Sequence, residues 1–171
     1  KIDILSASAH KCNGPKGIGF IYIRNGIKPV SLINGGKQEN NMRAGTENIP
    51  AIAGFKKALL INNAKDSFNS YYITKIRNHF IKRIIDEIDD VIINGSIESR
   101  LPGNVNVSFA DVSGESVLIQ LDRKNIYCST GSACDAGTTN VSHVIKAIGT
   151  PYEYMTGTLR FTFSDSNTIE E

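Results

Sequence analysis

Hydrophobic residues form two short runs at the start of the chain, separated by a stretch of polar residues and glycine. Residues 2–5 are the first run and residues 18–23 the second. Short apolar runs rich in β-branched residues and bounded by turn residues are typical of strands. Gly14, Pro15 and Gly17 lie between the runs and predict a tight turn. We expect two strands here, belonging to a mostly parallel sheet.

The middle of the chain has the periodicity of helices. Apolar residues recur at helical spacing from Pro50 onward, and Asn62 and Asn63 interrupt the pattern. A second, longer helix is predicted over residues 67–88. Its apolar side consists of Phe68, Tyr72, Ile76, Phe80, Ile81, Ile84, Ile85 and Ile88. Its solvent side carries Lys75, Arg77, Lys82 and Arg83.

The last part of the chain alternates short strands with short helices. Strands are predicted at residues 91–93, 104–109, 126–127 and 158–164. Ser113 and Ser142 are well suited to begin the two helices between them. In the last strand, alternation places Arg160 on the face opposite Leu159, Phe161 and Phe163.

Two long stretches lack any hydrophobic period and are predicted to be loops. Residues 34–48 are polar and rich in glycine, and Gln38, Arg43 and Thr46 within them are suited to line a polar or anionic ligand. Residues 128–139 are small and hydroxylated, so we expect an exposed loop that carries Cys134. A thiol on such a loop is a candidate nucleophile.

Composition narrows the class of protein. The chain has 171 residues, of which 40% are hydrophobic and 21% charged, as in ordinary globular proteins. The net charge is +2 and the basic residues are scattered, which predicts no nucleic-acid partner. No apolar run is long enough for a membrane span, so no membrane association is expected. Three cysteines favour a reducing compartment, the cytoplasm, and the start at Lys1 suggests a fragment.

The first predicted turn concentrates reactive side chains. Ser8, His10 and Lys11 follow the first strand within four positions. A desolvated lysine amine is a nucleophile toward carbonyl groups, although a solvated lysine on a turn is the simpler interpretation.

A zinc site is the alternative use of the cysteines. It would combine Cys12, Cys128, Cys134, His10 and His143. Because no C-x-x-C spacing is present, we expect no metal.

Several motifs together resemble one enzyme family. Two motifs resemble the fold-type I pyridoxal phosphate enzymes of aminotransferase class V. The first is residues 8–11 followed by 14–17, and the second is Gly35-Gly36 followed by residues 38–39 and 43–46. Residues 101–109 resemble the small domain of the same family. Residues 129–134, with 142–144 and 159–161 after them, resemble the NifS-type cysteine desulfurases with a long cysteine-bearing loop.

The resemblance implies how the cofactor is held. Lys11 would form the Schiff base with pyridoxal 5'-phosphate and carry protons as a catalytic residue. His10 would be a catalytic neighbour of the cofactor, and Ser8 would hold its phosphate. Thr46 would reach the phosphate of the partner subunit's cofactor, which implies a homodimer.

The resemblance also implies a reaction. Cys134 would attack the sulfur of L-cysteine and carry it as a persulfide, leaving L-alanine, while Arg160 would bind the substrate carboxylate. A sulfur-acceptor protein of iron–sulfur cluster assembly or a thiolation pathway would then take the sulfur. There are two alternatives. The first is another class V enzyme, either a selenocysteine lyase or an aminotransferase. The second is a non-catalytic dimerisation or docking module.

The same resemblance gives the expected architecture, an α/β fold. Residues 1–50 would end the large cofactor-binding domain, residues 51–90 would be linking helices, and residues 91–171 would form an α+β small domain with the cysteine loop. A full member of the family is about twice as long. The chain would then be the C-terminal half of a cysteine desulfurase and would be inactive alone.

Overall fold

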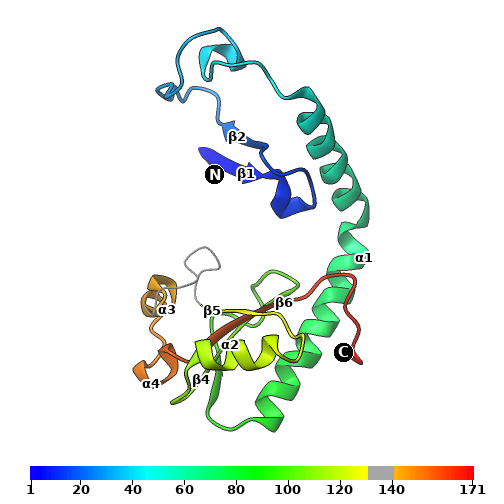
Figure 1. The fold of residues 1–171 in the computed structure, drawn as a ribbon, viewed down its shortest axis with the longest axis vertical. Coiled ribbons are helices and arrows are strands. Elements are labelled where there is room, and N and C mark those ends of the chain that lie inside the picture. The colour runs from blue at the N-terminus through cyan, green and yellow to red at the C-terminus, as the bar shows by residue number, and fades with distance from the viewer. Residues whose placement is uncertain (131–140) are drawn as a thin grey trace. The chain divides into compact units, whose positions relative to one another are not determined.

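The computed structural model describes residues 1–130 and 141–171, except for the side chains of residues 65–68. The chain divides into two compact units, Lys1–Asp66 and Ser67–Glu171 (Figure 1). The overall class is α/β, as expected from the sequence. Each unit is described by itself below.

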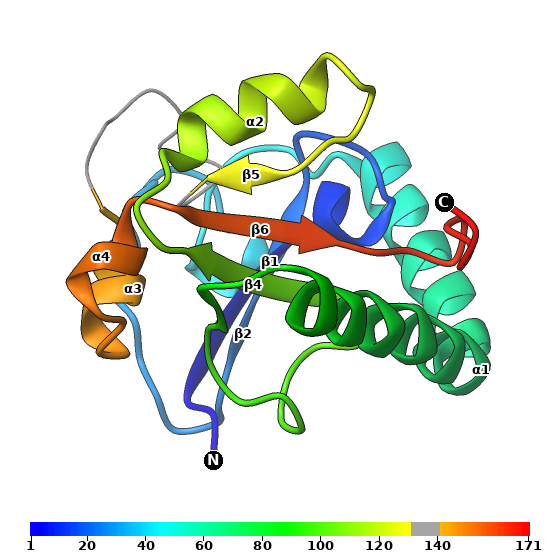
Figure 2. The ribbon, with the colours of Figure 1, turned by 90° about the horizontal axis from the view of Figure 1, so that it is seen from below.

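The first unit begins with two strands, β1 (Ile4–Ser8) and β2 (Gly19–Ile23). Both strands are labelled in Figure 2, and they pair antiparallel. Ile4 lies opposite Ile23, and Ser8 lies opposite Gly19. The expected parallel arrangement is wrong for these strands. A parallel pair needs a crossover of about a dozen residues or more, and the connection here closes through one short 3₁₀ helix, η1 (Ala9–Cys12).

The expected break between two helices is also wrong. A single helix, α1 (Ile49–Glu87), runs through Asn62 and Asn63 and is shared by both units. The Asn62 side chain is occupied by a hydrogen bond to the carbonyl of Cys12, at 3.0 Å. The polar loop before α1 contains a second 3₁₀ helix, η2 (Glu39–Asn41).

The second unit contains a four-stranded antiparallel sheet in the order β3-β4-β6-β5. Its strands are β3 (Val91–Ile93), β4 (Asn104–Phe109), β5 (Ser129–Thr130) and β6 (Thr158–Thr162). Three of the four predicted strands are therefore confirmed. The strand predicted at residues 126–127 is wrong, because pairing with β6 begins only at Ser129.

Three further helices belong to this unit, α2 (Gly114–Asp122), α3 (His143–Ala147) and α4 (Tyr152–Met155). The two predicted caps are confirmed. Ser113 Oγ accepts the Ser116 N–H, and Ser142 Oγ accepts the Val144 N–H, each at 3.3 Å. None of the helices in the described part of the chain has the length and apolar character needed to traverse a bilayer.

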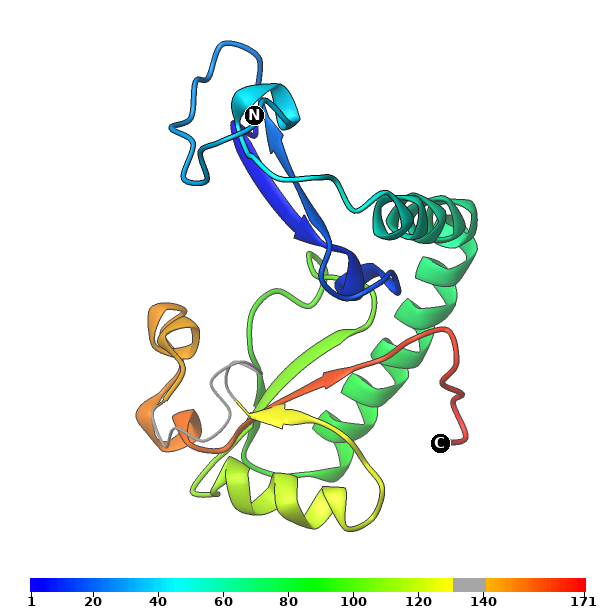
Figure 3. The ribbon, with the colours of Figure 1, turned by 45° about the horizontal axis from the view of Figure 1, so that its top comes forward.

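The core of the second unit lies on one face of the sheet. Val105 and Val107 of β4 and Leu159 of β6 are almost fully buried, and Ile81 of α1 packs with them. Helix α2 lies beside β5 and β6 (Figure 3). Its partly buried apolar side chains belong to the same cluster. The Phe80 ring lies 5.0 Å from the ring of Phe161. This packing fixes β6 and therefore the backbone of Arg160.

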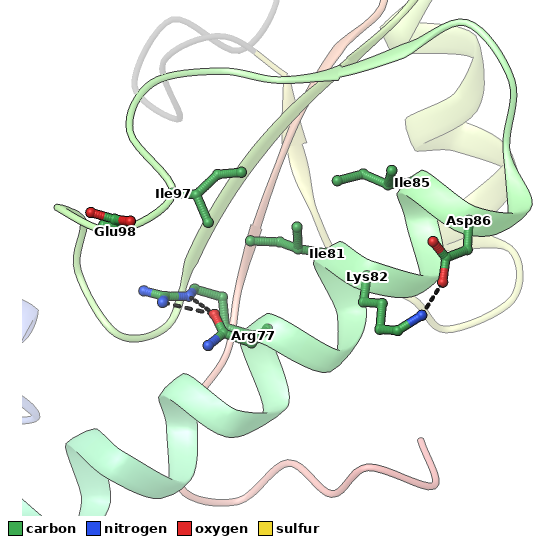
Figure 4. A pocket seen from close by; sticks show the side chains of 8 residues that line it. Arg77, Ile81, Lys82, Ile85, Asp86, Ile97 and Glu98 are labelled. Atoms are coloured by element: carbon green, nitrogen blue, oxygen red, sulfur yellow. Dashed lines mark hydrogen bonds and ion pairs between the residues drawn. The ribbon is translucent and has the colours of Figure 1, made fainter.

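Arg77 departs from its predicted place on the solvent side of α1. Its side chain is only 5% exposed, and its guanidinium donates to the Leu101 carbonyl and to Asn78 Oδ1. These acceptors replace water, which allows the charge to be buried. Arg77 also lines an open pocket of about 400 Å³, together with Ile81 and Ile97 (Figure 4).

Truncating Leu159 is expected to destabilise the second unit strongly. Leu159→Ala removes a side chain that is 1% exposed and should lower the free energy of unfolding by about 2–5 kcal/mol. Leu101→Ala is the matched control, because that side chain is 75% exposed and its loss should cost less than about 0.5 kcal/mol. Urea unfolding of both variants measures the difference, and equal effects would contradict the described core.

Candidate active site

The turn that carries Lys11 is closed by backbone hydrogen bonds of one buried residue. Ala9 is fully buried, its N–H donates to the Ile18 carbonyl at 3.0 Å, and its carbonyl accepts the Gly14 N–H at 2.9 Å. The side chains of His10 and Lys11, in η1, remain exposed. The backbone of the turn is therefore held in place without using its reactive side chains.

The local sequence explains why the chain turns so sharply. Asn13 ends η1 in the left-handed conformation with φ 60°, which asparagine tolerates better than most residues. A Cβ on Gly14 would lie 3.0 Å from both the Cβ and the carbonyl oxygen of Ala9. A side chain at position 14 would therefore crowd the turn at Ala9.

The turn is also docked on the first part of α1. Asn62 donates to the Cys12 carbonyl, and Gly54 leaves room for the ring of Pro15, since a Cβ on Gly54 would lie 2.7 Å from Pro15 Cγ. Sequence reasoning missed both contacts. Asn62 was interpreted as a helix interruption, and nothing in the local pattern shows that its partner lies at position 12.

Three predicted site residues come together in this unit. Ser8 ends β1, and His10 and Lys11 follow directly in η1. Within the part of the chain that the structure describes, the Lys11 amine forms no ion pair and the Ser8 hydroxyl no hydrogen bond. Thr46 belongs to the same unit and is exposed.

The loop before Thr46 is ordered by its own polar groups. Gln38 Oε1 accepts the Gly45 N–H at 3.2 Å, and the Ala44 N–H donates to the Ile33 carbonyl at 3.0 Å. Gly45 has φ +109°, a conformation that favours glycine. The loop thus fixes the backbone immediately before Thr46.

Arg160 lies in the second unit, in the middle of β6. It is paired with Asn106 of β4 on one side and with Ser129 of β5 on the other. The expectation that it faces away from the apolar residues is confirmed, because Leu159 points into the core and strands alternate faces. Arg160 as a whole is half-buried, and its guanidinium has no hydrogen-bond partner among the described residues. The fork is available for a carboxylate.

A buried polar network on the same face as Arg160 was missed by the sequence reasoning. Asn94 Nδ2 donates to Asn106 Oδ1 and to Ser108 Oγ, both at 2.7 Å. Ser108 is fully buried, although the alternation of polar and apolar residues in β4 would by itself place it on a solvent-facing side. The alternation of polar residues in β4 was the only signal of this network in the sequence. Alternation does not show whether the polar side chains face solvent or form a buried network.

The two remaining cysteine positions differ. Cys134 lies outside the described residues. Cys128 is half-buried beside the core, and burial raises the pKa of its thiol. No cluster of three or more metal-binding side chains is present among residues 1–130 and 141–171.

The comparisons with known proteins identify the family. The model of the family described as aminotransferase class-V matches residues 1–171, so the chain belongs to the aminotransferase class-V family. Two similar curated relatives are each named Cysteine desulfurase IscS. The protein of Dictyoglomus turgidum is 46% identical and that of Methanosarcina thermophila 43% identical, each over 99% of this chain.

Solved structures agree with this family. A NifS-like protein has a TM-score of 0.85 at 32% identity, and the NifS-like protein of Rickettsia africae has a TM-score of 0.84 at 29% identity. Each match covers 99% of this chain, but only 43% and 44% of the other chain. The chain likewise spans 43% and 42% of the two curated relatives.

Filling the space at Gly54 is expected to loosen the lysine turn. Gly54→Val places methyl groups where the Pro15 ring lies, and overpacking of this kind costs about 1–3 kcal/mol. Amide hydrogen exchange at Ala9 should therefore accelerate roughly tenfold.

Ala53→Val is the matched control, because Ala53 is exposed one position earlier in the same helix. If only helix propensity mattered, Ala53→Val would destabilise the helix and Gly54→Val would stabilise it. Overpacking against Pro15 predicts the opposite order of stability. Faster exchange in the control than in Gly54→Val would show that Pro15 does not pack on Gly54.

Cys128 is expected to react slowly with alkylating reagents in the folded chain. Burial raises the pKa of the thiol, so less of it is thiolate at pH 8 than in an ordinary cysteine, and the thiolate is the reactive form. Alkylation by iodoacetamide should accelerate as the pH rises past the usual range of a thiol, and should be fast at pH 8 in urea. Peptide mass spectrometry measures it, and rapid labelling of the folded chain at pH 8 would contradict the assigned burial.

Proposed function

We propose that this chain is part of a pyridoxal phosphate-dependent cysteine desulfurase. The observation that supports the proposal most directly is the exposed Lys11 side chain, which has no ion-pair partner among the described residues and lies on a turn whose backbone is fixed by Ala9. The family and the names of the curated relatives agree with it. Because the chain spans less than half of those relatives, the activity concerns the protein as a whole.

The residues of the turn fit the cofactor. Pyridoxal phosphate requires an accessible primary amine for its aldehyde and hydrogen-bond donors for its phosphate. Lys11 offers the amine, and Ser8 an exposed hydroxyl without a partner among the described residues. When bound, the cofactor supplies an electron sink for reactions of amino acids. The residues that we expect to hold it are Lys11, His10, Ser8 and, from the partner subunit of a homodimer, Thr46.

The remaining assigned residues act on the substrate. In the proposed reaction the carbon–sulfur bond of L-cysteine breaks, the sulfur joins Cys134 as a persulfide, and the carbon takes a proton to give L-alanine. Lys11 carries protons, and the guanidinium of Arg160, a half-buried residue, binds the substrate carboxylate. A sulfur-acceptor protein in the cytoplasm then receives the sulfur, for cluster assembly or thiolation.

A hybrid enzyme tests this function. This chain replaces the matching part of the Dictyoglomus turgidum relative, and cysteine-dependent alanine formation is measured. The hybrid should be active, and the chain alone inactive. Lys11→Ala should lower the rate on the order of 10²–10⁴-fold, because it removes the proton carrier. Lys16→Ala, an exposed lysine beside the same turn, should leave the rate nearly unchanged.

Borohydride reduction provides a second measurement that does not depend on turnover. Mass spectrometry should find the pyridoxyl group on the peptide that contains Lys11, and not on that peptide in the Lys11→Ala hybrid. A modified Lys16 peptide, or full activity of Lys11→Ala, would overturn the assignment of Lys11. A hybrid that folds and binds the cofactor but forms no alanine would overturn the proposed activity.

A further inference from the structure

Four polar residues form one row across the sheet of the second unit. Arg160 is paired with Asn106 on one side and Ser129 on the other, and the Asn94 N–H donates to the Asn106 carbonyl at 2.9 Å. Directly opposed side chains on a sheet have Cβ atoms about 4.5–5.5 Å apart. The side chain of Asn106 therefore lies between those of Asn94 and Arg160.

A chain of hydrogen bonds with a fixed direction begins behind this row. The Met155 carbonyl can only accept, so the Thr158 hydroxyl donates its single proton to it, at 3.0 Å. The hydrogen bond of 2.7 Å between Thr158 and Ser108 must then use the Ser108 proton. Ser108 Oγ is left as an acceptor for any further neighbour.

The direction continues to Asn106. Since Ser108 Oγ must accept, the group of Asn94 that faces it is the amide nitrogen, which also donates to Asn106 Oδ1 at 2.7 Å. The Asn94 oxygen accepts the Thr150 hydroxyl at 3.0 Å. With its oxygen turned toward Asn94, Asn106 has its nitrogen turned away from Asn94. Arg160 is the next residue of the row beyond Asn106.

The network is buried at its Thr158 end and more exposed at its Arg160 end. Asn94, Ser108, Thr150 and Thr158 are at most 8% exposed. Asn106 and Arg160 are half-buried, and neither the Asn106 nitrogen nor the Arg160 guanidinium donates to any described residue. The network therefore ends, at its accessible side, in two adjacent groups that can only donate.

We propose that Asn106 donates a hydrogen bond to the same substrate carboxylate that Arg160 binds, and that Asn94 is the positioning residue that fixes the direction of its amide. This inference rests on the proposed function, in which an amino acid is the substrate. Adjacent donors without an acceptor between them suit an anion with two oxygens. Because the buried hydrogen bonds hold the Asn106 amide before binding, little ordering is required when the substrate arrives.

Kinetics of the hybrid enzyme test the role of Asn106. Asn106→Asp keeps the shape but replaces the donor by a negative acceptor, so the KM for L-cysteine should rise about tenfold or more, with a much smaller change in kcat. Asn104→Asp is the matched control, because Asn104 is half-buried two positions earlier on the same face of β4. Its KM should change less than about twofold. Equal KM values for the two variants would overturn the proposal.

A double variant tests the role of Asn94. Asn94→Asp can no longer donate to Asn106 Oδ1, so the amide reverses and KM should rise without a comparable loss of kcat. In the Asn106→Ala background the same change should leave KM unaffected, because Asn94 acts through Asn106. A further rise of KM in that background would overturn the positioning role.

Binding of an amino acid to the 171-residue chain tests this inference independently of the proposed activity. In an NMR titration, the side-chain N–H signals of Asn106 should shift with L-alanine and not with L-alaninamide, which lacks the carboxylate. The Arg160→Ala variant should show no such shift. If the signals do not respond to L-alanine, or respond equally to both compounds, the inference fails even if the hybrid is active. A shift specific to L-alanine supports it even if the hybrid forms no alanine.

Discussion

The register between β4 and β6 is the constraint on which the second unit depends. Placing Val107 opposite Leu159 builds the core on one face, and the same pairing places Asn106 opposite Arg160 on the other. A slip of one residue would exchange the two faces, and would bury the guanidinium while exposing the core. The core thus selects the register, and the register brings the polar groups of the candidate site together.

The local patterns predicted most of the elements of the second unit but not the partners of polar residues. The strand at residues 104–109 and the helix starts at Ser113 and Ser142 depend on neighbours in sequence, so they were predicted correctly. Arg77 was placed in solvent because the sequence does not show that the distant Leu101 carbonyl, together with the adjacent Asn78 side chain, accepts hydrogen bonds from its guanidinium. Buried polar groups require such distant partners, and a single sequence does not reveal them.

The candidate site shows the same division. The motif at residues 8–11 could be found because strand, turn and reactive side chains are contiguous, and the structure places them on one turn. The contacts that hold this turn, from Asn62 and Gly54, come from a helix much later in the chain. The antiparallel pairing of β1 and β2 was likewise missed, since apolar runs do not specify strand direction.

The turn that carries Lys11 is closed by the main chain of Ala9, so its fold does not depend on the side chains that it presents. Neither His10 nor Lys11 contributes a side-chain hydrogen bond or ion pair to the described fold, so both positions are free to change identity while the backbone keeps its path. Such a turn tolerates substitution of the side chains that it presents. Evolution or protein design can therefore change these reactive groups without changing the backbone that carries them.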